Sequence, residues 1–427
     1  MNIHLAYGKT GLELELKDAW NVQVVEPRYV PGLPDPQKTL QDALRNPIGT
    51  KALVKLVRPG SHIGIIVNDI TRATPTPLIL RTLLNELVGV PHENIILFIA
   101  LGTHRPNTPQ ELDQMLGPDM SRSYQIIQNN AFDRTTQNHL GQTSQGHDIW
   151  INRALMDCEV KILTGFIEPH FFAGFSGAGK AVMPGMAGLE TVLGNHSAQN
   201  IAHPNATWGN TWGNPIWEEV HEVALRIKPT FLVNVTLNRD KAITAVFAGD
   251  LDQAYTQGID FVRQASMIAV DQLFDIVVTT NSGYPLDLNL YQAVKGMSAA
   301  AQVVRQGGAI VIAAECWDGI PEHGMYGQLL KDSTNPATLL QTIMQPGFSK
   351  QDQWQAQIQA QIQLKADVYV YSSYLRPEQI RSALLKPAES IGGVLDKLVK
   401  QYGKEARICV LPEGPQTIPY IAQQATY

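Results

Sequence analysis

Three histidines stand in short polar motifs of the kind that carry acid–base or metal chemistry. His104 lies in "GTHRP", His170 in "EPHFFAG" and His196 in "LGNHS". An imidazole exchanges protons near neutral pH and also binds metal ions, so either role is open for each, beside the plain alternative of a packed histidine. None of the 11 histidines forms an HxH or HxxxH pair. A bound metal ion would therefore need most of its ligands from another molecule.

A glycine-rich stretch, "GFSGAGKAVMPG" (174–185), presents a lysine, Lys180. Its spacing imitates a phosphate-binding loop, which requires Ser or Thr after the lysine to hold Mg²⁺. Ala181 stands at that position, and Pro184 would cut short the long helix that such a lysine begins. The stretch disfavours a nucleoside triphosphate site. A structural glycine turn and a lysine presented for other chemistry both stay open.

Two further stretches combine charged and polar side chains. In "NDITRATP", Asp69 and Arg72 are either an ion pair within the loop or a site in which the arginine binds a carboxylate or phosphate. In "LNLYQAVKGM", Tyr291 and Lys295 are one helical turn apart, with Gln292 adjacent. This second pattern indicates either a surface helix with an extended lysine or a substrate-binding face.

Short β-rich runs alternate with helical patterns along the whole chain. This alternation predicts an α/β fold with mainly parallel, Rossmann-like sheets. Ligands bind at the carboxyl ends of the strands in such folds, where the loops of Asp69, His104 and His170 follow directly. Thr108 and Glu111 also form a capping box at the start of a helix. The expected strands are 63–67, 94–100, 160–165, 230–237, 275–280, 308–314, 368–373 and 407–412.

The chain of 427 residues is too long for one ordinary core and predicts two domains. We expect an N-terminal α/β domain over 1–270, carrying Lys180 and the three histidines, and a C-terminal α/β domain over 271–427 that closes a cleft. The boundary follows a helix ending near 266, and the termini can cross over. The Gln-rich stretch 351–365 has the apolar spacing of an exposed helix.

Composition narrows the function classes. The net charge of −6 provides no basic field for nucleic acid, and no apolar stretch reaches the about 20 residues of a membrane helix. The three cysteines are far apart and without a CxxC pair, which argues against a disulfide framework or a cysteine-built zinc site. The start lacks the features of a signal peptide. We expect a cytoplasmic protein without nucleic-acid or membrane partners.

Taken in order, "NDITRATP", "GTHRP", "EPHFFAGFSGAGKAVMPG", "LGNHS" and "LYQAVKG" resemble the nickel-dependent lactate racemase family, nearly from end to end of the chain. The resemblance implies two α/β domains with the active site in the interdomain cleft. It also implies a nickel pincer nucleotide, built from a nicotinic acid precursor, and cofactor-biosynthesis proteins that mature the enzyme. An oligomer is compatible with it.

The resemblance assigns roles to individual residues. It implies that Lys180 carries the cofactor through a thioamide link, that His196 binds nickel, and that His104 and His170 are the acid–base pair. Further matches contact the cofactor (Asp69, Ser176, Gly177 and Gly179) or the substrate (Arg72, Tyr291, Gln292, Lys295 and Trp354). The lysine loop is then no phosphate loop, and its glycines let the backbone pass close to the cofactor.

The implied reaction suits these residue types. Three pincer donors and one imidazole complete the square-planar coordination that nickel(II) favours. Racemising a 2-hydroxy acid by proton removal is difficult, because the hydrogen beside a carboxylate is barely acidic. Hydride transfer avoids this difficulty: a neutral histidine takes the hydroxyl proton while the hydride leaves C2, and a planar 2-keto acid forms. Return of the hydride to the other face of the keto acid inverts the centre. The two enantiomers present the hydroxyl on opposite sides, so two bases are expected.

Three alternative functions remain. A nicotinamide dehydrogenase would need a GxGxxG fingerprint between strand and helix, which is missing from the sequence. A cofactor carrier or sensor would not need both His104 and His170. A family member acting on malate or on a longer aliphatic or aromatic 2-hydroxy acid is the strongest rival. The candidates for lining the side-chain pocket are Phe171, Phe172, Tyr284 and Tyr291.

Overall fold

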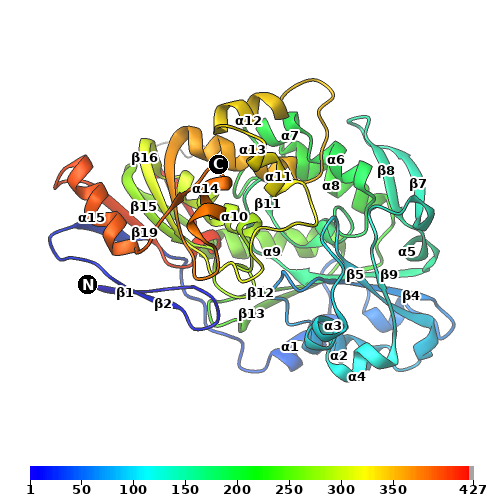
Figure 1. Ribbon diagram of the computed structural model, residues 1–427. Helices are drawn as coiled ribbons and strands as arrows, with labels where there is room; N and C mark the ends of the chain where they lie inside the picture. Colours follow the sequence, from blue (N-terminus) through cyan, green and yellow to red (C-terminus); the bar gives the residue numbers. More distant parts are fainter. Residues whose placement is uncertain (423–427) are drawn as a thin grey trace.

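Two six-stranded sheets frame the computed structural model, which describes residues 1–422 (Figure 1). In the first sheet every neighbouring pair is parallel except β13 and β12, which are antiparallel. Its order is β13 (Ile243–Gly249), β12 (Phe231–Leu237), β9 (Val160–Phe166), β4 (Ile63–Asn68), β5 (Ile95–Ala100) and β6 (Gln125–Gln128). The strands β9, β4 and β5 thus lie side by side, with the candidate loops at their carboxyl ends.

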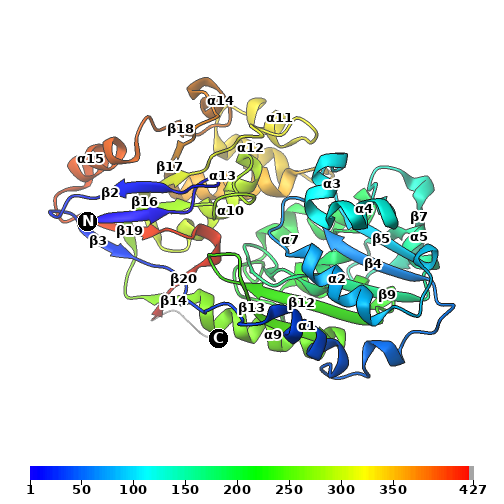
Figure 2. The same cartoon turned by 90° about the horizontal axis from the view of Figure 1, so that it is seen from below.

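Helices cover both faces of this sheet, as its continuous apolar strands require. Along β4, Ile65 packs with α1 (Pro36–Arg45) and α2 (Thr76–Glu86), whereas Ile66 belongs to the core on the opposite face. That opposite face is covered by α8 (Pro215–Arg226) and α9 (Leu251–Ser266). Figure 1 shows α1 and α2 on one side of the sheet and α9 on the other, and Figure 2, the view from below, shows α2 in front of the strands.

The second sheet is parallel throughout. One face packs against α10 (Leu290–Ala301) and α13 (Gln353–Lys365). The other packs against α15 (Ile391–Tyr402) and the hairpin of β1 (Asn2–Leu5) and β2 (Leu12–Glu15). Its order is β18 (Lys386–Pro387), β17 (Ala366–Tyr371), β16 (Val304–Ala313), β15 (Phe274–Thr280), β19 (Arg407–Leu411) and β3 (Asn21–Val24).

The two ends of the chain cross between the halves. Strand β3, from the N-terminal 25 residues, is the edge strand beside β19 in the second sheet. Strand β14 (Met267–Val270), which directly follows α9, pairs with β20 (Ile418–Ile421) near the C-terminus. We propose that the N-terminal domain ends at this point in the chain, with the first strands packed on the C-terminal domain.

Smaller elements complete the frame. They include the antiparallel hairpins β7 (Gln137–Gln142) with β8 (Asp148–Asn152) and β10 (Pro169–His170) with β11 (Gly174–Phe175). The remaining helices are α3 (Pro109–Leu116), α4 (Pro118–Ser123), α5 (Arg153–Asp157), α6 (Leu189–Asn195), α7 (Ala198–Ala202), α11 (Tyr326–Lys331), α12 (Pro336–Ile343) and α14 (Pro377–Ser382).

The eight expected strands are all present, and the predicted α/β class is confirmed. The capping box of Thr108 and Glu111 is formed at the start of α3. The prediction of an exposed Gln-rich helix was wrong, because α13 is buried. Its glutamines donate to backbone carbonyls instead of water, as in the bonds from Gln357 to Ala198 (2.9 Å) and from Gln359 to Ala383 (2.8 Å).

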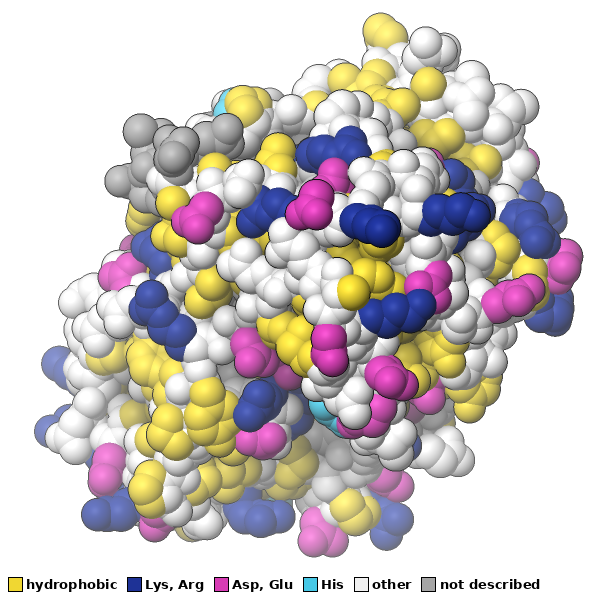
Figure 3. All heavy atoms as spheres, turned by 90° about the vertical axis from the view of Figure 1, so that its left-hand side faces the viewer, with side chains coloured by type: hydrophobic (Ala, Val, Ile, Leu, Met, Phe, Trp, Pro, Cys, Tyr) yellow, Lys and Arg dark blue, Asp and Glu magenta, His cyan; other side chains and the backbone are white. Residues whose placement is uncertain are grey.

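Figure 3 shows basic and acidic side chains interspersed over the face that carries α15 and the β1–β2 hairpin, outside the grey atoms. None of the helices within residues 1–422 combines the length and the apolar character that crossing a bilayer requires.

Candidate active site

A cavity of about 920 Å³ lies at the carboxyl ends of β9, β4 and β5. Its walls come from both halves of the chain: the loops after these strands and α6 on one side, α10 and α13 on the other. The cavity brings together His104, His170, Lys180, His196, Asp69, Arg72, Ser176, Gly177, Tyr291, Gln292, Lys295 and Trp354. Residues predicted from six separate stretches of sequence therefore share one site.

His104 forms a dyad with Asp69. Its Nδ1 lies 2.7 Å from Oδ2 of Asp69, and the other carboxylate oxygen accepts from the hydroxyl of Thr71 at 2.7 Å. A carboxylate only accepts, so Nδ1 carries the proton and Nε2 of a neutral His104 has a free lone pair. Asp69 is buried, and although burial raises its pKa, His104 and Thr71 lower it below the usual value. His104 is thus oriented as a base, and the possible ion pair of Asp69 with Arg72 is not formed.

His170 has a different environment. It is 5% exposed, and its ring packs against Phe171 and Phe172, with centroids 4.9 and 4.6 Å away. Its Nδ1 accepts from the backbone N–H of Ala173 at 3.3 Å. Burial, followed by the charge of Lys180, holds the pKa of His170 well below its usual value. The ring is therefore neutral, with its proton on Nε2.

The loop of Lys180 differs from a phosphate loop. Lys180 lies in η4 (Ala178–Ala181), a short 3₁₀ turn that no long helix continues. Gly177 has φ +90°, and a Cβ there would lie 2.7 Å from Oδ1 of Asn234, which accepts from the N–H of Ala178. The glycine thus permits a tight turn over β12. The turn directs one lysine into the cavity without a helix N-terminus behind it.

Three cationic side chains share this buried space. Burial, followed by the charge of Arg72, lowers the pKa of Lys180 to about 7. Burial and Arg72 also lower the pKa of Lys295 well below its usual value, and its Nζ donates to Oε1 of Gln292 at 2.6 Å. A large fraction of Lys180 is therefore a neutral, nucleophilic amine at neutral pH. Binding of an anion in the cavity would favour the protonated forms of both lysines.

His196, the C-cap of α6, has the properties of a metal donor. It is 3% exposed, and its Nδ1 is buried without a hydrogen-bond partner. Burial, followed by Lys180, lowers its pKa well below the usual value, so the ring is neutral. Within residues 1–422, no group of three or more His, Cys, Asp or Glu side chains could hold a metal ion. The residues present fit a metal whose other donors arrive with a bound molecule.

Helices α10 and α13 close the cavity opposite the loops. Nε1 of Trp354 donates to the hydroxyl of Tyr291 at 2.9 Å, which fixes both rings. Trp354 also stands edge-on to His196, and Tyr291 edge-on to His104, at 4.9 and 6.4 Å between centroids. The alternative of a surface helix for Lys295 is wrong, because α10 is buried.

Two predicted residues lie elsewhere. Gly179 faces α8, where a Cβ would meet Ala224 at 3.1 Å, and does not line the cavity. Tyr284 is also outside: it lies under Lys9 and accepts a hydrogen bond from Gln114. Phe171, Phe172 and Tyr291 do line the cavity.

Sequence reasoning missed two side chains that hold the site. Asn234 anchors the glycine turn, and Glu168 binds Arg72 with 2.7 Å between Oε1 and Nη1. Asn234 interrupts an apolar strand, and Glu168 stands two residues before His170. Both sequence features were visible, but neither indicates which residue the side chain binds until the fold is known.

The fold is a two-domain α/β structure whose cavity brings three histidines together with a buried lysine of lowered pKa. Residues 7–209 match the family described as the lactate racemase N-terminal domain, and residues 270–418 the lactate racemase C-terminal domain. The chain belongs to the lactate racemase family and is an isomerase. The lactate racemase of Lactiplantibacillus plantarum is 38% identical over 88% of this chain and 89% of its own length. That of Thermoanaerobacterium thermosaccharolyticum is 33% identical over 98% of this chain and 99% of its own.

Solved structures agree with this assignment. The lactate racemase apoprotein from Thermoanaerobacterium thermosaccharolyticum superposes with a TM-score of 0.90 at 32% identity, covering 98% of this chain and all of that one. A protein from Thermotoga maritima has a TM-score of 0.71 at 18% identity, covering 92% of this chain and all of its own. The second likeness concerns the fold alone.

Proposed function

We propose that this racemase interconverts the enantiomers of lactate or a close 2-hydroxy acid, with a nickel pincer nucleotide carried by Lys180. The observation that carries the proposal is the joint presence, in one cavity, of a lysine with a pKa of about 7, a partnerless imidazole nitrogen and two more histidines. When bound, the cofactor would supply a hydride acceptor and donor.

Lys180 and His196 would hold this group. A neutral amine is the form of lysine that becomes acylated, and the lowered pKa of Lys180 provides it near pH 7. His196 would donate one neutral nitrogen to nickel(II), which accepts imidazole ligands readily. Asp69, Ser176 and Gly177 would lie around the cofactor, and cofactor-biosynthesis proteins would mature the enzyme, which we place in the cytoplasm.

His104 and His170 would manage the proton of the substrate hydroxyl. Nε2 of His104 is free to accept that proton from one enantiomer, because Asp69 occupies Nδ1. His170 would serve the other enantiomer from the tautomer that carries its proton on Nδ1, which gives up the bond from the N–H of Ala173 and frees Nε2 to accept. Arg72 and Lys295 would bind the carboxylate, while Tyr291, Gln292 and Trp354 would enclose the rest of the molecule.

Cofactor-loaded protein offered a panel of 2-hydroxy acids in a chiral assay tests the substrate. We expect racemisation of lactate or a similarly small acid. Intact mass should show a nucleotide-sized adduct that Lys180→Ala lacks, and His196→Ala should retain less nickel. Full activity of nickel-free protein made without the biosynthetic enzymes would contradict the proposal.

The dependence of acylation on pH checks the lysine separately. In cofactor-free protein, a lysine-acylating reagent should modify Lys180 increasingly as pH rises through about 7, because its amine loses the proton there. Ordinary lysines follow only near their usual pKa of about 10.4. Peptide mapping measures the site of modification, and equal pH dependence at Lys180 and surface lysines would refute the assignment.

A further inference from the structure

Glu168 carries a buried carboxylate that none of these roles uses. Its side chain is 7% exposed, and its two oxygens bind different halves of the protein. Oε1 accepts from Nη1 of Arg72 at 2.7 Å, and Oε2 accepts from Nε2 of Gln416 at 2.8 Å. Gln416 ends η5 (Gly414–Gln416), just before the strand β20. The carboxylate therefore joins a cavity arginine to the C-terminal segment.

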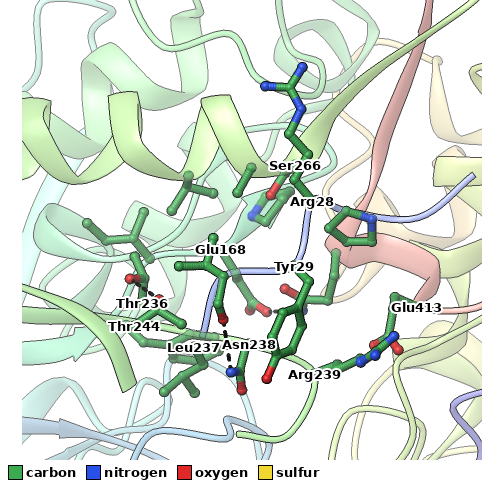
Figure 4. A pocket seen from close by; sticks show the side chains of 18 of the residues that line it. Arg28, Tyr29, Glu168, Thr236, Leu237, Asn238, Arg239, Thr244, Ser266 and Glu413 are labelled. Carbon is green, nitrogen blue, oxygen red and sulfur yellow. Dashed lines mark hydrogen bonds between the residues drawn. The ribbon is translucent and has the colours of Figure 1, made fainter. Parts of the chain in front are cut away.

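The backbone of Glu168 is held as firmly as its side chain. Its N–H donates to Oγ of Ser176 at 3.0 Å, and its carbonyl accepts from the N–H of Ser176 at 2.9 Å. The same hydroxyl donates to the carbonyl of Phe166 at 3.0 Å. Figure 4 shows Glu168 among the side chains around a second hollow, of about 830 Å³ and partly open to solvent. Its partner Arg72 lines the active cavity, so Glu168 is a fixed contact directly behind that arginine.

Arg72 depends on this carboxylate for its orientation. Within residues 1–422, its ion pair with Glu168 is the only one it makes. The other nearby carboxylate is Asp69, whose oxygens already bind His104 and Thr71. We propose that Glu168 is a positioning residue that turns Arg72 toward the substrate carboxylate and keeps it away from Asp69. This inference rests on the proposed function, in which Arg72 binds substrate.

Loss of the Glu168 charge has two predictable consequences. Arg72 becomes free to pair with Asp69, which would weaken the hold of that carboxylate on His104. The positive charges of the cavity also lose a counterion: burial and Arg72 lower the pKa of Lys295, and Glu168 opposes that shift. Substrate binding should suffer first, because the guanidinium that receives the carboxylate is no longer fixed.

Glu168→Gln in the cofactor-loaded enzyme tests the proposal, because glutamine keeps the size but not the charge. We expect KM for the hydroxy acid to rise about tenfold, the effect of weakening one charged hydrogen bond, with a smaller change in kcat. In an Arg72→Ala background the same substitution should change KM less than about twofold, because residues that act together are not additive. Calorimetric binding of a 2-keto acid to cofactor-free protein should show the same non-additivity.

The control is Glu86→Gln. Glu86 is a 9%-exposed partner of Arg45 at 2.9 Å, on α2 and outside the cavity lining, so KM should stay at its wild-type value. Gln416→Leu, which removes only the second bond of Glu168, gives an independent variant if Glu168→Gln does not fold, and should also raise KM. A normal KM in Glu168→Gln with a raised KM in Arg72→Ala overturns this inference alone. Equal losses in both backgrounds overturn it as well, whereas an unchanged KM in Arg72→Ala removes Arg72 from the proposed function.

Discussion

His104 and His170 follow two parallel strands of one sheet, β5 and β9, that flank β4, yet their surroundings are opposite. His104 is 28% exposed at its side chain and hydrogen-bonded to a carboxylate. His170 is 5% exposed, caged by two phenylalanines and bonded only through a backbone N–H at Nδ1. One ring presents a lone pair at Nε2 and the other presents a proton. A racemase must act on two mirror-image substrates, but the two histidines that we propose as its bases have unlike environments.

The difference shows what each environment contributes. Asp69 holds the proton of a neutral His104 on Nδ1, so that Nε2 is the acceptor atom. Burial and the nearby lysines oppose protonation of His170, so that ring gives a proton up readily once it is charged. The carboxylate of a bound substrate would offset those lysines. The binding of substrate and the basicity of His170 would therefore be coupled.

The largest effect should come from removing either ring. His104→Ala and His170→Ala should each lower kcat by about 10²–10⁴-fold, the usual contribution of a general acid–base group. Nickel content and the mass of the Lys180 adduct should match those of the wild-type protein. If either variant kept full activity toward both enantiomers, the proposal that the two histidines act as an acid–base pair would be wrong.

Asp69→Asn should affect His104 and leave His170 unchanged, because Asp69 contacts only His104 of the two. We expect a loss of up to about 10²-fold in kcat, because the neutral amide no longer fixes the tautomer of His104 or stabilises its charge. In a His104→Ala background the same substitution should cost little more. A further loss of similar size in that background would show that Asp69 acts on something else.

His170 should leave a signature in the stability of the cofactor-free protein. Its folded pKa lies below the unfolded value of about 6.5, so below that pH the unfolded chain binds a proton that the folded protein refuses. The free energy of unfolding should fall as pH drops below about 6.5, by up to about 1.4 kcal/mol per pH unit for this group. His170→Phe should show a shallower fall in urea titrations, and an unchanged slope would contradict the burial effect.

The smallest effect should come from Tyr291→Phe, beside His104. This change removes the hydroxyl that accepts from Nε1 of Trp354 and keeps the ring that packs near His104. Loss of one neutral hydrogen bond predicts a change in KM of less than about tenfold, with kcat nearly unaltered. A large fall in kcat would mean that the phenol itself takes part in proton transfer.

Much of this site was visible in the sequence because chemistry-bearing residues follow strands. The loops after β4, β5 and β9 meet because parallel neighbouring strands end at one edge, so His104 and His170 could be placed together. The place of Gly179 outside the cavity lining could not be predicted, since the spacing of a glycine does not reveal which side of a turn it faces. Burial of the α13 glutamines depends on carbonyls from distant segments, which no local pattern specifies.

The roles of the histidines also could not be separated by sequence. Both stand in similar post-strand motifs, and only the fold brings Asp69 to one of them and Phe172 to the other. Glu168 illustrates the same limit, because its two partners lie 96 and 248 residues away along the chain.

The central claim is that His104 and His170 move only the hydroxyl proton and never the hydrogen on C2. The most direct test follows a substrate deuterated at C2 through early turnover in ordinary water. If the claim is correct, the product of opposite configuration keeps nearly all of its deuterium by mass spectrometry, because that atom never resides on an exchangeable N–H. Product that has lost the label to solvent would contradict the claim and make the two histidines a proton-abstracting pair.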